Sequence, residues 1–108
     1  MKKSYVANVV IRTPQVGINR DSVAVPRGFH LLSVSAFIPP DSLLDIKDNN
    51  KSIFGKNPIG GGIFNTFTRT FNFPVPVPVE TTELDIELEL HTATTDPVFI
   101  TLTGVVEE

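Results

Sequence analysis

The chain has 108 residues, a net charge of −3 at pH 7 and no cysteine. The lack of cysteine excludes disulfides, thiolate nucleophiles, cysteine-ligated zinc and iron–sulfur clusters. No stretch approaches the roughly 18 consecutive apolar residues of a transmembrane helix, so we expect no membrane span. The basic start 1–3 is followed by an apolar stretch that Asn8 interrupts and Arg12 ends, so we also expect no signal peptide.

The N-terminal part of the chain predicts two strands separated by a loop. Residues 4–12 are rich in β-branched residues and place four side chains on one face: Tyr5, Ala7, Val9 and Ile11. Residues 13–21 contain proline, glycine and asparagine and predict a loop. Residues 22–25 predict a short strand before a turn at 26–28.

The next segment alternates between apolar and polar residues from His30 until two prolines stop it at 39–40. This predicts a half-buried strand with His30 on its apolar face, which also carries Leu32, Val34, Ala36 and Ile38. We expect residues 41–46 to form one helical turn capped by Asp41. Residues 48–51 predict a turn, and residues 55–62, with four glycines and a proline, predict the most flexible segment.

Three further segments alternate with a period of two. Residues 63–73 predict a strand with aromatic residues and Arg69 on one face and threonines and asparagine on the other. Residues 83–90 predict a strand with Leu84, Ile86, Leu88 and Leu90 opposite acidic residues. Residues 98–106 predict the last strand, with Gly104 as a candidate bulge.

Six to eight short strands, few helix signals and nine prolines together favour an all-β fold. We expect an antiparallel β-sandwich resembling a jelly roll, with residues 1–108 forming a single domain.

The sequence contains no motif typical of catalysis or of cofactor binding. Its two histidines, His30 and His91, lack a nucleophile nearby in the sequence, and the glycines at 60–62 are not followed by the Lys-Ser/Thr of a phosphate loop. We therefore expect no catalytic residue, no metal site and no cofactor. The acidic pI near 5.3 also disfavours nucleic-acid binding.

Charge is unevenly distributed along the chain. Residues 1–79 carry nine Lys or Arg and four Asp, whereas residues 80–108 carry eight Asp or Glu and no Lys or Arg. Within the second group, Glu83, Asp85, Glu87 and Glu89 form a ladder of carboxylates about 6.5–7 Å apart on one strand face. Three interpretations remain open: a solvated face, a surface complementary to basic residues of another subunit, or a divalent-cation site.

Arg69 lies among aromatic residues in the predicted alternation, where a guanidinium must leave the core or find a carboxylate. One interpretation is an internal ion pair with the acidic strand. The other is an interface patch, because arginine and aromatic residues often anchor interfaces. That candidate patch consists of Phe67, Arg69, Phe71 and Phe73.

Prolines alternate with valines at 74–79. In an extended strand, Pro74, Pro76 and Pro78 remove every amide donor from one edge, whereas the amides of the valines stay able to pair. We therefore expect this segment at a sheet edge or between subunits, with its proline side unpaired.

Two classes of function fit these features better than an enzyme does. A carbohydrate-binding or host-binding adhesion module suits the fold, although such sites often stack sugars on Trp or Tyr, and this chain has no Trp and one Tyr. The other class is a structural subunit of an assembly.

In overall layout the chain resembles the small β-sandwich proteins of bacteriophage particles, such as single-jelly-roll vertex proteins and capsid decoration proteins. The resemblance covers most of the chain without a diagnostic motif. It implies that the protein is made in the host cytoplasm and forms a homo-oligomer in the virion. The loops of this oligomer would contact the major capsid protein. We then expect segments 13–21 and 55–62 to be mobile in the isolated subunit and ordered in the assembly.

Overall fold

The computed structural model describes residues 2–55, 58–64 and 68–107. The described residues form nine strands and one short 3₁₀ helix. These are β1 (Lys2–Ile11), β2 (Gly17–Ala24), β3 (Phe29–Phe37), β4 (Leu43–Asp48), β5 (Lys51–Ser52), β6 (Ile59–Gly60), η1 (Gly61–Phe64), β7 (Thr70–Pro78), β8 (Glu83–Leu90) and β9 (Val98–Glu107).

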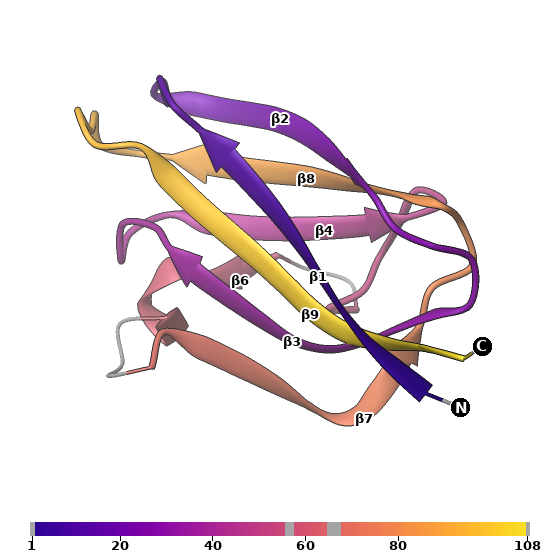
Figure 1. Ribbon diagram of the computed structural model, residues 1–108. Coiled ribbons are helices and arrows are strands. Elements are labelled where there is room, and N and C mark those ends of the chain that lie inside the picture. The colour runs from indigo at the N-terminus through magenta and orange to yellow at the C-terminus, as the bar shows by residue number, and fades with distance from the viewer. Residues whose placement is uncertain (1, 56–57, 65–67, 108) are drawn as a thin grey trace.

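The strands form two antiparallel sheets that face each other as two layers (Figure 1). The first sheet has the order β1-β9-β3-β7, and the second has the order β2-β8-β4-β5, with β6 also pairing with β4. The predicted antiparallel β-sandwich is therefore confirmed.

The strand pairing is nested from the ends of the chain toward its middle. β1 pairs with β9, β2 with β8, β3 with β7, and β4 with β5 and β6. Along the chain, β1, β2, β3 and β4 alternate between the two sheets. Nested pairs wound across two sheets are the arrangement of a jelly roll, as the sequence predicted.

One hydrophobic core lies between the two layers. The alternation predicted for residues 83–90 is confirmed in β8, where Leu84, Ile86, Leu88 and Leu90 are fully buried. From the first sheet, Ile100 and Leu102 of β9 and Phe29, Leu31 and Val34 of β3 are fully buried as well. The period-two pattern thus places one face of each strand in the core and leaves the other face outward.

Two segments predicted as other structures are strands. Gly17 to Asp21, expected in a mobile loop, belong to β2, where Asn19 donates from its side-chain amide to the carbonyl oxygens of Gln15 and Leu88. The helical turn expected at 41–46 is wrong, because residues from Leu43 onward form β4, with Leu44 and Ile46 buried in the core. Side-chain burial against β8 outweighs the local capping preference of Asp41.

The strand predicted at 63–73 is shorter and lies later in the sequence. Residues 61–64 form η1, and β7 begins only at Thr70. The flexible segment expected at 55–62 is also partly ordered, because Ile59 and Gly60 pair with β4 and Gly61 is buried. Residues 56–57 of that segment lie outside the described residues.

A bulge in β3 changes which side chains of that strand face the core. The register of β3 with β9 shifts between Leu31 and Ser33, so that Leu31 and Val34 point inward while His30 and Leu32 are only half-buried. The prediction that His30 and Leu32 share the apolar face with Val34 is therefore wrong. The bulge predicted at Gly104 instead lies opposite it, on β3.

The turn predicted at 48–51 is confirmed as a two-residue hairpin between β4 and β5. Asp48 pairs with Lys51, and Asn49 and Asn50 both have positive φ, at 52° and 65°. Two left-handed residues are typical of a type I′ turn, in which asparagine is favoured. No helix among the described residues is long and apolar enough to cross a membrane.

Candidate functional site

The outer face of the second sheet carries the acidic ladder predicted from the sequence. We call it the charged face; it consists of Ile18, Arg20, Leu43, Asp45, Lys47, Glu83, Asp85, Glu87 and Glu89. The ladder lies on β8, between β2 and β4, so its carboxylates have side chains of both neighbouring strands beside them. The register forms rows across the sheet, in which Glu87 lies between Arg20 and Asp45, and Glu89 lies between Ile18 and Leu43.

Glu87 is the centre of the ion pairs on this face. Its two carboxylate oxygens lie 3.3 Å from Arg20 Nε and 3.3 Å from Lys47 Nζ, which reach it from β2 and β4. Burial alone would raise the pKa of Glu87, but the hydrogen bonds and charges of Lys47 and Arg20 together outweigh it and lower that pKa below its ordinary value. Glu87 therefore stays ionised and is neutralised within its own sheet.

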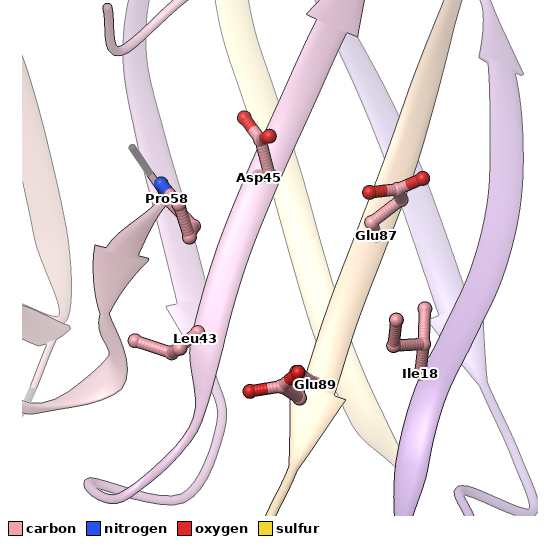
Figure 2. Close-up of a pocket in the computed structure, with 6 residues that line it drawn as sticks. All are labelled: Ile18, Leu43, Asp45, Pro58, Glu87 and Glu89. Carbon is pink, nitrogen blue, oxygen red and sulfur yellow. The ribbon is translucent and has the colours of Figure 1, made fainter. Parts of the chain in front are cut away.

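The neighbouring carboxylates also have local partners. His91 Nε2 lies 2.7 Å from Glu89 Oε2, and the Ser52 hydroxyl donates to Asp45 Oδ1 at 2.6 Å. Figure 2 shows how Asp45, Glu87 and Glu89 surround a shallow hollow of about 160 Å³, whose apolar lining comes from Ile18, Leu43 and Pro58.

The four carboxylates of the ladder differ in their partners. Glu87 and Glu89 have partners within the subunit, whereas Glu83 and Asp85 are in none of the ion pairs or side-chain hydrogen bonds of the described residues. Among those residues, no three carboxylate or imidazole groups converge as metal ligands would. The arrangement fits a solvated face best, and its role as an interface stays a prediction.

Arg69 does not share a face with Phe71 and Phe73. It has a positive φ of 52° just before β7 begins, and its guanidinium carbon lies 4.5 Å from the ring centre of Phe37 on β3. The left-handed backbone turns the side chain to the outer face of the first sheet, whereas the carboxylates of β8 lie on the second sheet. The predicted common face is therefore wrong; its fourth member, Phe67, lies outside the described residues.

Phe71 and Phe73 are half-buried and pack with Phe54, which follows β5 in the other sheet. The ring centres of Phe54 and Phe73 are 6.0 Å apart, and those of Phe71 and Phe73 are 5.1 Å apart. This aromatic cluster closes the side of the sandwich where β7 and β5 are the outermost strands. Both residues thus have a packing role within the subunit.

The proline segment lies where the sequence predicted it, on the edge strand β7 of the first sheet. Val79 N donates to Phe29 O at 2.9 Å, and Pro78 lies opposite His30. In an antiparallel ladder this arrangement directs the backbone nitrogen of Pro78 away from β3. Pro74 and Pro76 lie in a stretch from Phe73 to Pro76 that has no register with β3.

The central part of the outer face of the first sheet is a surface that the sequence analysis missed. We call it the uncharged face; it consists of Val6, Asn8, Val10, Ser33, Ser35, Phe37, Thr70, Asn72, Phe99, Thr101 and Thr103. One polar row crosses all four strands in register: Asn8, Thr101, Ser35 and Thr70. The Thr101 hydroxyl donates to Asn8 Oδ1 at 2.7 Å, and the hydroxyls of Ser35 and Thr70 are hydrogen-bonded at 2.9 Å.

Beside that row lies an apolar row of Val10, Phe99 and Phe37, three residues that are 37%, 46% and 49% exposed. Arg69 borders it above Phe37. The signal for this face was the alternation of serine and threonine with apolar residues at 33–36 and 100–103. Its extent depends on strand order, which the alternation does not specify.

No family model, curated protein or solved structure matches this chain. The features that bear on its function are therefore the two faces and the exposed edges of the sandwich.

Proposed function

We propose that this chain is a non-enzymatic structural subunit of a bacteriophage particle, of the vertex or decoration type, which forms a homo-oligomer and contacts the major capsid protein. The observation that carries the proposal is the uncharged face, which extends across all four strands of the first sheet. Jelly rolls are a common architecture of viral shells, although they also serve in lectins and cupins. The fold therefore permits the proposal, and the surface supports it.

The uncharged face has the composition of an interface core. Such cores are depleted of charge and enriched in aromatic residues, and this face presents Phe37 and Phe99 among Ser, Thr, Asn and Val. The charged face contrasts with it, because its five carboxylates and its two basic side chains suit contact with water. One side of the sandwich therefore suits a protein neighbour, while the other suits solvent.

The test is whether the purified protein forms a defined assembly through the uncharged face. We expect a closed oligomer by sedimentation velocity and electron microscopy, and we expect Thr101→Lys to abolish it because a cation would be buried at the interface centre. Asp85→Lys on the charged face is the matched control and should leave the assembly intact. A protein that stays monomeric, or an assembly indifferent to Thr101→Lys, would contradict the proposal.

The second candidate is a carbohydrate-binding or host-binding adhesion module. A specific observation favours it: Phe37 and Phe99 lie opposite each other, half-exposed, beside the polar row that contains Asn8 and Thr101. Exposed rings next to hydroxyl and amide groups can stack on a sugar and bond to its hydroxyls. Binding on a glycan array that Phe99→Ala removes would support this candidate, and binding to no glycan would exclude it.

A further inference from the structure

The edges of the two sheets differ in how well they are protected against pairing with another chain. Unpaired edges are commonly blunted by prolines, by charged residues or by very short strands. β7 carries Pro74, Pro76 and Pro78, β2 carries Arg20 and Asp21 at its middle, and β5 and β6 each have two residues. Each of these edges therefore has a protecting feature.

β1 has none of these features beyond the two lysines at its start. It is ten residues long, and its residues 4–11 contain no charge and no proline. Within the described residues it pairs with β9 alone, and Tyr5, Val6 and Val10 are all exposed. A long, uncharged and exposed edge strand is a ready template for sheet extension.

Two backbone hydrogen bonds establish which backbone groups face this open edge. Ala36 N donates to Arg69 O and Val79 N donates to Phe29 O, so Ser35 and His30 direct their own amides and carbonyls toward β9. They lie opposite Thr101 and Val105, which means that odd-numbered residues of β9 bond to β3 and even-numbered ones bond to β1.

The register of β1 with β9 pairs odd with even positions, as in Tyr5 opposite Gly104. The odd-numbered residues of β1 therefore bond to β9. The amides and carbonyls of Ser4, Val6, Asn8 and Val10 point to the open edge, and their side chains lie on the outer side of the first sheet.

We propose that β1 pairs antiparallel with β1 of a second copy of this chain, joining two first sheets into one continuous eight-stranded sheet. A two-fold axis matches two identical edges in length and in the spacing of donors and acceptors. With Val6 opposite Val6 of the second copy, Lys2 lies opposite Val10 and Lys3 opposite Val9, so no two cations face each other. Centring the pair on Ala7 would instead place Lys2 opposite Arg12.

This inference deepens the homo-oligomer of the proposed function by naming one of its contacts. Hydrogen exchange followed by NMR tests it, because the β1 amides at the open edge and the β1 amides bonded to β9 should respond differently to protein concentration. We expect the amides of Val6, Asn8 and Val10 to exchange rapidly at high dilution and slowly in the dimer. Those of Ala7 and Val9 should be protected in both states, since they bond to β9.

The matched variants are Val6→Pro and Val6→Thr. Proline removes a donor from the open edge while leaving the bonds to β9 in place, so we expect the dimer dissociation constant to rise about tenfold or more. Threonine keeps the donor and should preserve the dimer. If Val6→Pro does not fold, as judged by circular dichroism, Asn8→Lys places a charge at the same edge and should weaken the dimer similarly.

A protein that is monomeric at the highest concentration it reaches would overturn the pairing. So would a dimer in which the amides of Val6 and Asn8 remain unprotected, because that dimer would use another surface. A dimer with these amides protected that builds no larger assembly would uphold the pairing and contradict the proposed function. The two proposals can therefore fail separately.

Discussion

Gly104 lies directly against the ring of Phe29, so close that a β carbon at position 104 would sit 2.6 Å from two atoms of that ring. The same β carbon would also collide with the carbonyl oxygen of His30. Phe29 is fully buried, so any shift of its ring must displace other core side chains. A glycine within β9 thus leaves room in the core for the ring of Phe29, at the start of β3.

Gly104→Ala should therefore lower the free energy of unfolding by about 2–3 kcal/mol, because the core must shift to accept a methyl group. Gly60→Ala is the control, since a β carbon there meets no atom within 4 Å, and its effect should stay within about 0.5 kcal/mol. Urea denaturation of both variants measures the difference. Equal stabilities would show that the ring of Phe29 can relax away from position 104.

The ion pairs of Glu87 predict a pH dependence of stability. Because the pKa of Glu87 is lowered in the folded state, the contribution of its ionised form is present above the unfolded pKa and is lost as pH falls through the folded pKa. Glu87→Gln should cost about 0.5–1 kcal/mol at neutral pH, a modest value because Arg20 and Lys47 are partly solvated.

Denaturation of the wild type and Glu87→Gln at neutral and at acidic pH provides the measurement. The difference between the two proteins should shrink toward zero as Glu87 becomes protonated. Glu83→Gln serves as the control, since Glu83 takes part in none of the described ion pairs. A constant difference across pH would show that the charge of Glu87 does not stabilise the fold.

The β4–β5 hairpin predicts opposite effects of two substitutions at Asn50, which has a φ of 65°. Asn50→Gly should leave stability unchanged or raise it by about 0.5 kcal/mol, since glycine adopts this backbone readily and Asn-Gly is the favoured type I′ pair. Asn50→Val should cost about 1–2 kcal/mol, because a β-branched residue is strained there. Thermal unfolding monitored by circular dichroism distinguishes the two outcomes.

The proline edge of β7 predicts a change in association without a loss of folding. Pro78→Val restores an amide that points away from β3, so the variant should form edge-to-edge oligomers while keeping a cooperative unfolding transition. Light scattering with increasing concentration detects them. A variant that remains as dispersed as the wild type would mean that the prolines do not protect this edge.

The sequence predicted the fold best where one face of a strand is wholly apolar. In β8 every second residue is Leu or Ile, so the two-residue period could be read directly. In β2 the inward-facing series includes Asn19 and Asp21, which lie at the margin of the sandwich and give no apolar alternation. The sequence therefore suggested a loop where the structure has a strand.

The candidate site was predictable only in part, for a related reason. Alternation correctly placed Glu83, Asp85, Glu87 and Glu89 on one face, but the neighbours Arg20 and Lys47 depend on strand order. Alternation also failed at Arg69, where a positive φ reverses the direction of the side chain before β7 starts. A single left-handed residue is enough to invalidate a period-two argument.

The nested pairing of strands has a consequence for how the chain folds during synthesis. β1 finds its partner in β9, and β2 finds its partner in β8, so neither strand can complete its pairing until nearly the whole chain has left the ribosome. Contacts between residues so distant in sequence make folding slow. Until β9 is synthesised, both edges of β1 are unpaired. Neighbouring nascent chains at high local concentration can then exchange their β1 strands before β9 pairs with them.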